Sequence, residues 1–205
     1  MKNKNILQIG LVTLALILTY LVYDSIMKPV KFNEEVSKKE LVIIDKLKDI
    51  RTMEIAYKGV YGKYTGSFDT LVDFIKNGKL PIIKKIGNVP DSLTEEQALK
   101  KKIVSRDTVY VNAYEELFAG KKEIDLTTLK FIPNTQKEFK IQATVISKSS
   151  MQVPVFEVTA SYDDYLEGMD KQLLNNLKTK ATNLNRFGGL KLGSMDEPST
   201  DGNWE

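Results

Sequence analysis

The hydrophobic pattern of the chain starts with one long uncharged stretch. Ile6–Tyr23 contains 18 residues and no charged side chain. As a helix rising about 1.5 Å per residue it would reach roughly 27 Å, and an extension to Met27 would match the hydrocarbon thickness of a bilayer. Because no small-x-small cleavage pattern follows it, the stretch predicts an uncleaved membrane anchor rather than a removed signal peptide.

A second pattern follows the anchor. Apolar residues recur at intervals of three, four or seven, which places them on one face of a helix whose other faces carry Lys, Asp and Glu. This stripe comprises Val36, Ile43, Leu47, Ile50, Met53, Tyr57 and Val60. Such a stripe either faces the chain's own core or packs against another helix in a coiled coil. Pro29 predicts a bend or a break before this helix, and Gly59 and Gly62 predict its end.

The next segment predicts a short helix with a defined start and end. Ser67 is placed to cap its first turn, and Asp69 suits the positive end of the helix dipole. Gly78 is a natural residue at the other end. The apolar side of this helix is Phe68, Leu71, Val72 and Ile75. A linker with Pro81 and Pro90 is expected to follow, and then a helix over the sequence DSLTEEQALKKKIV.

The pattern turns to strands after Asp107. DTVYVNAY and LKFIP predict short strands, and EFKIQATVI and MQVPVFEVTA predict two longer strands joined by a turn, because apolar and polar residues alternate along them. Pro154 suits an edge or the end of a strand. Helical spacing returns over Asp163–Asn185. The fold class is therefore predicted to be α+β, with a long N-terminal helix packed on a small antiparallel sheet and with additional helices.

These patterns divide the chain into five segments. They are a short cytoplasmic tail (1–5), a transmembrane helix (6–27), an amphipathic helix (28–62), a globular domain (63–191) and an acidic C-terminal loop (192–205). Lys2 and Lys4 precede the span but Lys28 and Lys31 follow it, so the positive charges alone do not fix the orientation. We favour an orientation with the N-terminus in the cytoplasm and the C-terminal domain on the opposite side of the membrane, because so short an N-terminal tail is unusual cargo for export.

Composition removes most enzyme chemistry. The chain has no cysteine and no histidine, which excludes disulfides, thiolate nucleophiles, Cys-based zinc sites and the Ser-His-Asp triad. A membrane-anchored enzyme or ligand binder would need polar groups converging in a deep pocket, and the sequence names none. The net charge of +3 comes from mixed Lys and Asp/Glu. The basic run LKKKIVSR is short and lacks aromatic residues, so we expect neither an enzyme nor a nucleic-acid partner.

Two motifs resemble the type IV pilin and type II secretion pseudopilin family. The first, IRTMEIAYKGVYGKYTGSFDTLVDFI, is similar to the family's pattern of an aliphatic residue, a Tyr, a Gly-x-Tyr and a Ser-initiated helix. Its matching residues are Ile55, Tyr57, Gly62, Tyr64, Ser67, Leu71 and Val72. The second, LGSMDEPSTDGNWE, is similar to the C-terminal loop of major pseudopilins. Asp201, Asn203 and Trp204 stand at the matching places.

The resemblance implies a subunit of a type II secretion-like or pilus-like assembly. Such a subunit is anchored once in the inner membrane, with its C-terminal domain in the periplasm. Copies of the chain, or other pilin-like subunits, would polymerise into a filament by bundling their apolar helices. The residues expected at this assembly interface are Leu11, Leu14, Ile17, Leu21, Ile43, Leu47, Ile50 and Met53.

Processing of the N-terminus is where the sequence departs from the family. Family members are cut after a Gly, and the new chain carries a Glu at its fifth position. Cleavage after Gly10 would put Leu11 first and Ala15 fifth, and no glutamate lies in the span. In the family this Glu pairs with a neighbouring subunit's amine inside the apolar bundle. The alternative is therefore an uncleaved single-span scaffold of another cell-envelope complex.

The acidic tail is a candidate cation site. Major pseudopilins bind calcium in their C-terminal loop, and at the corresponding place this chain has oxygen donors of the kind that Ca²⁺ prefers. The expected ligands are Ser194, Asp196, Glu197 and Asp201. The alternative is a solvated, mobile acidic tail. Trp204, the only tryptophan, is expected to pack on the sheet rather than to dock a partner.

Overall fold

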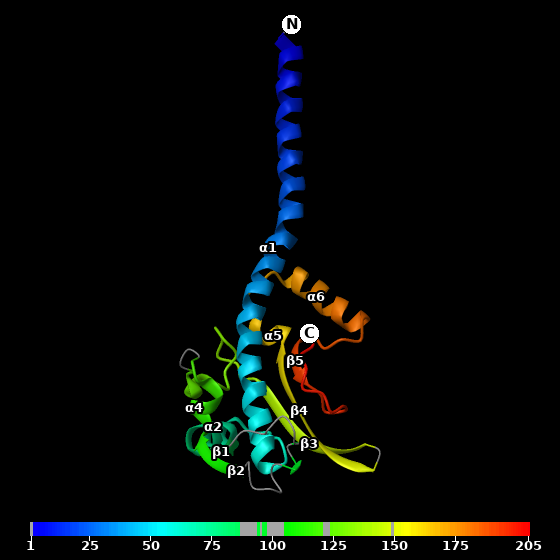
Figure 1. The fold of residues 1–205 in the computed structure, drawn as a ribbon. Coiled ribbons are helices and arrows are strands. Elements are labelled where there is room, and N and C mark those ends of the chain that lie inside the picture. The colour runs from blue at the N-terminus through cyan, green and yellow to red at the C-terminus, as the bar shows by residue number, and fades with distance from the viewer. Residues whose placement is uncertain (1, 87–93, 95, 98–104, 121–123, 149) are drawn as a thin grey trace.

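The computed structural model describes residues 2–86, 94, 96–97, 105–120, 124–148 and 150–205. Its main feature is α1 (Lys2–Tyr61), a helix of 60 residues that is about 90 Å long at the usual helical rise. Figure 1 shows its N-terminal part standing clear of everything else. Pro29 lies inside α1, so the helix bends where it reaches the domain but does not break. It ends before Gly62, whose φ of 71° favours glycine.

α2 (Phe68–Asn77) begins as the sequence predicts. The Ser67 side chain caps it by accepting a hydrogen bond from the Thr70 amide at 3.4 Å. Its buried residues are Phe68, Leu71, Phe74 and Ile75. The helix ends at Gly78, where an added Cβ would lie 2.3 Å from the carbonyl oxygen of Phe74. A close approach of the backbone, rather than a positive φ, therefore requires glycine at this end.

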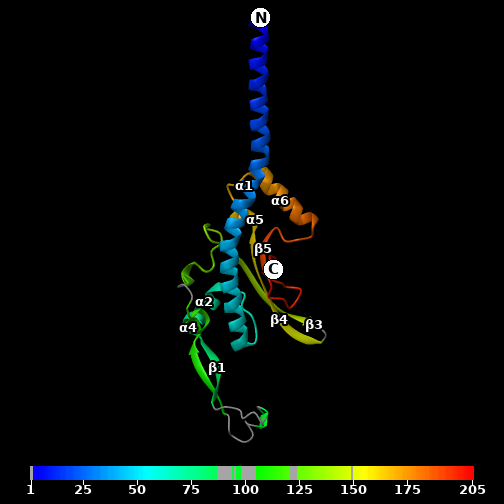
Figure 2. The same cartoon turned by 45° about the horizontal axis from the view of Figure 1, so that its top comes forward.

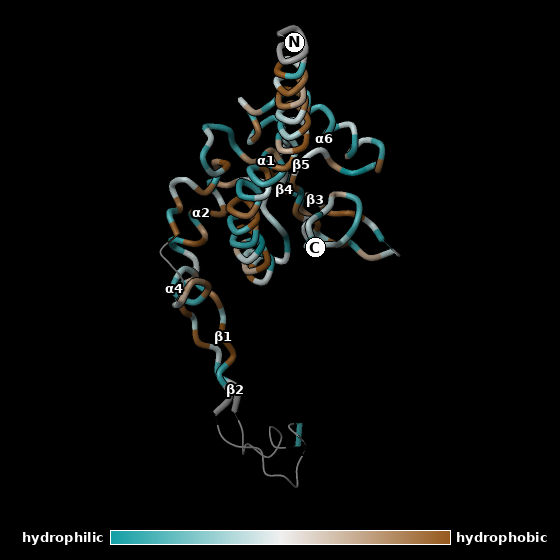
Figure 3. The backbone as a smooth tube through the Cα atoms, turned by 90° about the horizontal axis from the view of Figure 1, so that it is seen from above, coloured by the Kyte–Doolittle hydropathy of each residue, from teal (hydrophilic) through white to brown (hydrophobic). Residues whose placement is uncertain are grey.

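A two-stranded antiparallel sheet follows α2, in which β1 lies where a linker was expected and β2 begins two residues before the strand predicted over DTVYVNAY. β1 (Lys79–Ile86) pairs with β2 (Ser105–Asn112), and Pro81 lies opposite Tyr110. A proline is tolerated there because both strands of a two-stranded sheet are edge strands. Figures 2 and 3 show this hairpin extending away from the rest of the domain. Pro90 lies outside the described residues, as does most of the helix expected over DSLTEEQALKKKIV.

The main sheet has three antiparallel strands in the order β3–β4–β5. β3 (Lys140–Lys148) and β4 (Met151–Ser161) are the two long strands that the sequence predicts. β5 (Gly189–Gly193) was not predicted, because its five residues lie in a glycine-rich segment typical of a loop. β5 pairs with β4 only from Glu157 onward, so Pro154 lies where β4 has a neighbour on one side.

Short helices complete the fold. α4 (Ala113–Phe118) follows β2, and the 3-10 helix η1 (Leu126–Thr128) precedes β3. The helical segment predicted after β4 forms two helices, α5 (Tyr162–Tyr165) and α6 (Lys171–Asn183). Gly168 lies between them with a φ of 86°, a conformation that interrupts a helix and that residues with a Cβ rarely adopt.

The core surrounds the C-terminal half of α1. Figures 1 and 2 show α2, α4 and the β1–β2 hairpin on one side of this half and the three-stranded sheet on the other. The buried part of the predicted stripe is Val36, Ile43, Leu47, Ile50, Met53 and Tyr57. Phe32 extends the stripe by one turn, and Trp204 of the tail packs against the same core. The predicted α+β architecture is confirmed.

Candidate assembly surfaces

The N-terminal half of α1 has little cover from the rest of the chain. Side chains from Gln8 to Lys31 are exposed or partly exposed. Figure 3 looks down on this end and shows hydrophobic turns standing clear of the domain. The expected interface residues here are 51–58% exposed, namely Leu11, Leu14, Ile17 and Leu21. Apolar surface of this extent is unfavourable in water, so this half requires another apolar environment.

This half of α1 has the properties needed to cross a membrane. Among the described residues, α1 is the one helix long and apolar enough to do so by length and composition. Thr13 and Thr19 each donate their hydroxyl to the carbonyl four residues earlier, at 3.0 and 2.9 Å. These bonds satisfy the hydroxyl groups without water, as hydrocarbon requires. The first charges after the apolar stretch are Asp24 and Lys28, which form an ion pair at 2.7 Å.

The other half of α1 does not offer the interface that we expected. Ile43, Leu47, Ile50 and Met53 are at most 1% exposed. They belong to one hydrophobic cluster with residues of α2, β4 and β5. The expectation that these four contact another subunit is therefore wrong, because the chain's own domain covers them. An apolar stripe predicts that a helix face is buried, but it does not indicate whether the same chain or another chain buries it.

The C-terminal loop is tied to the domain by hydrogen bonds and an ion pair. The Asn203 amide donates to the Lys191 carbonyl at 2.9 Å, and its side chain accepts from the Lys191 amide at 3.0 Å. The same side chain donates to the carbonyl of Gly189 at 2.8 Å. Arg51 of α1 pairs with Glu205 at 2.8 Å, and this hydrogen bond lowers the pKa of the Glu205 carboxyl. The loop thus extends the edge of the sheet beyond β5.

The expected calcium ligands do not converge in this loop. The Ser194 hydroxyl oxygen accepts hydrogen bonds from the amides of Asp196 and Glu197, at 3.2 and 3.3 Å. Asp201 accepts one from the Ser199 hydroxyl at 3.1 Å. Within the described part of the chain, no three acidic side chains lie close enough to hold a metal ion. These residues form turns and do not fit a Ca²⁺ cage, so calcium binding rests on the resemblance alone.

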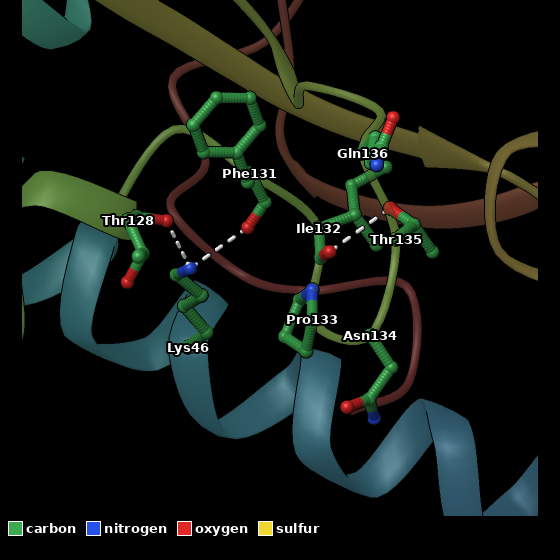
Figure 4. A pocket seen from close by; sticks show the side chains of 8 residues that line it. All are labelled: Lys46, Thr128, Phe131, Ile132, Pro133, Asn134, Thr135 and Gln136. Carbon is green, nitrogen blue, oxygen red and sulfur yellow. Dashed lines mark hydrogen bonds between the residues drawn. The ribbon is translucent and has the colours of Figure 1, made fainter.

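Lys46 anchors the loop before β3 to α1. Figure 4 shows its amine directed at the carbonyls of Thr128 and Phe131, the second at 2.7 Å. Burial lowers the pKa of this amine.

Beside the Lys46 amine lies a cavity of about 680 Å³. Its other lining side chains are uncharged, so the cavity offers no acid–base pair. Of the strand expected over LKFIP, only a bridge between Phe131 and Glu138 forms.

Glu54 is a buried carboxyl on the same half of α1. It is fully buried, and its Oε2 accepts a hydrogen bond from the Thr65 amide at 3.0 Å. Its Oε1 is buried and has no hydrogen-bond partner among the described residues. The sequence carried a signal for this position, since Glu54 lies four residues after Ile50 and three before Tyr57, on the apolar face. A carboxylate at a core spacing indicates either an ion pair or a raised pKa.

Comparison with known proteins adds no relative to this description. The chain gives no match to protein-family models, to curated proteins or to solved structures. The proposal below therefore depends on the architecture of the chain and on its contacts.

Proposed function

We propose that this chain is a structural subunit of a pilin-like assembly, of the kind formed by type II secretion pseudopilins. One observation carries the proposal: a single helix of 60 residues has one half that projects, exposed and apolar, and another half that is the core of an α+β domain. A subunit of this shape can bundle its projecting half with those of neighbouring subunits. The domains then lie on the outside of the bundle.

The projecting half would serve in two apolar environments in turn. Before assembly it crosses the inner membrane with the domain in the periplasm, and after assembly it lies in the centre of the bundle. Leu11, Leu14, Ile17 and Leu21 would face lipid in the first state and other helices in the second. Because the span carries no glutamate, packing between helices would depend on shape and apolar contact rather than on a buried ion pair. The proposed role is mechanical and not enzymatic.

Electron microscopy tests the proposal directly. Envelope fractions from cells that overproduce the full chain would be sheared and imaged with an antibody against the domain. We expect labelled filaments from the wild type and fewer or shorter ones from Leu14→Ala/Ile17→Ala, which removes side chains from one face of the span without adding charge. Leu16→Ala, on another face, is the matched control. An absence of labelled filaments in the wild type would contradict the proposal.

The second candidate is an uncleaved single-span scaffold of another cell-envelope complex. The absence of glutamate from the span favours it. Intact-mass spectrometry of the mature chain separates the two candidates. A chain that begins at Leu11 indicates pilin-like processing after Gly10. A chain that keeps residues 1–10, together with an absence of filaments, indicates the scaffold.

A further inference from the structure

The loop from Gly62 to Ser67 joins α1 to the rest of the domain. Ser67 caps α2, and the Tyr64 ring packs on Phe156 of β4 with centroids 4.6 Å apart. At Gly66 an added Cβ would lie 3.3 Å from the backbone nitrogen of Ala143 in β3. A single short loop therefore sets how the end of α1, α2 and the main sheet lie together.

One carboxyl holds this loop from the side of α1. The Thr65 amide donates to Glu54 Oε2 at 3.0 Å, while Oε1 is buried and finds no hydrogen-bond partner in the described part of the chain. Burial raises the pKa of Glu54 from 4.5 to about 8. In such a site an ionised carboxylate with one unpaired oxygen costs more free energy than a protonated carboxyl does.

The titratable neighbours do not supply a compensating charge. On α1, Tyr57 is one turn further along, and burial, with smaller contributions from Tyr61 and Glu54, raises the pKa of its hydroxyl. Arg51, one turn earlier, is paired with Glu205 of the tail at 2.8 Å. On the loop, the Tyr64 hydroxyl lies 3.4 Å from the Lys58 amine. β3 brings the uncharged residues Gln142 and Ala143 against the loop.

We propose that Glu54 is a proton-operated latch, whose protonated carboxyl holds the Gly62–Ser67 loop on α1 and whose ionisation weakens that hold. The inference does not depend on the proposed function. When the loop opens, the carboxyl gains water and regains its ordinary pKa, so the closed state binds the proton more tightly than the open state. Closure is therefore strongest below about pH 4.5 and weakens as the pH rises. It stops weakening above about pH 8, where both states are ionised.

Amide hydrogen exchange at Thr65 measures this latch in the full chain in detergent micelles. After correction for intrinsic exchange rates, protection in the wild type should fall by roughly tenfold per pH unit from about pH 5.5 to about pH 7.5, and then level off. Glu54→Gln has the same shape but no titratable proton. Its protection should vary less than about threefold across this range and should exceed that of the wild type by more than tenfold near pH 7.5.

A control variant and a second measurement complete this test. Glu40→Gln changes a different carboxyl on α1, which is half-buried and accepts a hydrogen bond from the Tyr165 hydroxyl at 2.8 Å. This variant should leave the pH dependence at Thr65 unchanged. If Glu54→Gln does not fold, carbon NMR of the labelled Glu54 carboxyl in the wild type replaces it. A titration midpoint above about pH 7 supports the latch. A midpoint below about pH 5.5, a flat wild-type profile, or an equal slope in Glu54→Gln overturns it.

Discussion

Both halves of α1 are rich in large apolar side chains, but only one half is covered by its own chain. Met53 and Leu47 in the domain half are fully buried, whereas Leu14 and Ile17 in the projecting half are 51% exposed. The two halves form one uninterrupted helix, so helix formation itself does not distinguish them. The difference lies in charge. The domain half has one apolar face and charged residues on its other faces, while the projecting half carries no charge from Ile6 to Tyr23.

This difference in charge indicates what kind of environment surrounds the projecting half of α1. An amphipathic helix finds an apolar environment on one side and water on the other, which a folded domain provides. A helix that is apolar on all sides needs an apolar environment all round, which lipid or a bundle of similar helices provides. The projecting half is therefore the part of the molecule that needs an apolar environment from outside the chain, and the domain half is the part that the chain itself covers.

Truncating one apolar side chain in each half of α1 should give the largest difference in the free energy of unfolding of the domain. Leu47→Ala opens a cavity in a fully buried site and should lower the free energy of unfolding of the domain by about 2–5 kcal/mol. Leu14→Ala should change it by less than about 0.5 kcal/mol, because that side chain is half exposed and lies outside the hydrophobic core that the described residues form. Urea unfolding of the full chain in detergent, followed by the fluorescence of Trp204, measures both. Equal effects would mean that the two halves are not independent.

A smaller effect is expected from the polar contacts of the domain half. Lys46→Met should destabilise the domain by about 1–3 kcal/mol, because the Phe131 carbonyl loses its donor in a partly buried site. The Thr128 carbonyl keeps the amide of Phe131 as a donor at 3.0 Å. Lys48→Met removes the same charge from an exposed position of α1 and is the control. A loss of stability no greater than that of the control would show that the hydrogen bonds of the Lys46 amine contribute nothing to stability.

The smallest effect is expected in the tail. Its carboxylates are spread along turns and do not converge, so 1 mM Ca²⁺ or EDTA should shift the melting temperature of the full chain by less than about 1 °C. Differential scanning fluorimetry in detergent measures this. A larger stabilisation by Ca²⁺ that disappears in Asp196→Ala/Asp201→Ala would contradict the structure of the loop. Such a result would support the calcium site that the resemblance implies.

Local signals in the sequence predicted the elements that depend on neighbours along the chain. The cap at Ser67, the strands β3 and β4 and the face of α1 all follow from spacing and residue type. β1 was missed because Pro81 was interpreted as a linker residue, and β5 because Gly189 and Gly193 are typical of loops. Both strands depend on a partner strand far away in the sequence.

The site was predicted less well than the fold for the same reason. The apolar stripe was identified, but whether the same chain or another covers it depends on tertiary packing. Lys46 and Glu54 acquire their roles from the carbonyl of Phe131 and the amide of Thr65, which no local pattern places beside them.

Cysteine cross-linking tests most directly the claim that copies of this chain cover the projecting half of α1. The chain has no cysteine, so each introduced cysteine reports only its own position. Leu11→Cys, Leu14→Cys, Ile17→Cys and Leu21→Cys would be co-expressed in all pairs, to allow for an axial stagger between helices, and oxidised in intact membranes. Met53→Cys, which is buried in the domain, is the control.

We predict disulfide-linked dimers for at least one pair in the projecting half and none for Met53→Cys. Dimers confined to particular pairs would also give the stagger between neighbouring helices. An absence of dimers from every pair, with the chain present in the membrane, would contradict the account. The projecting half would then be covered by lipid or by a different protein, and bundling between copies of this chain would be ruled out.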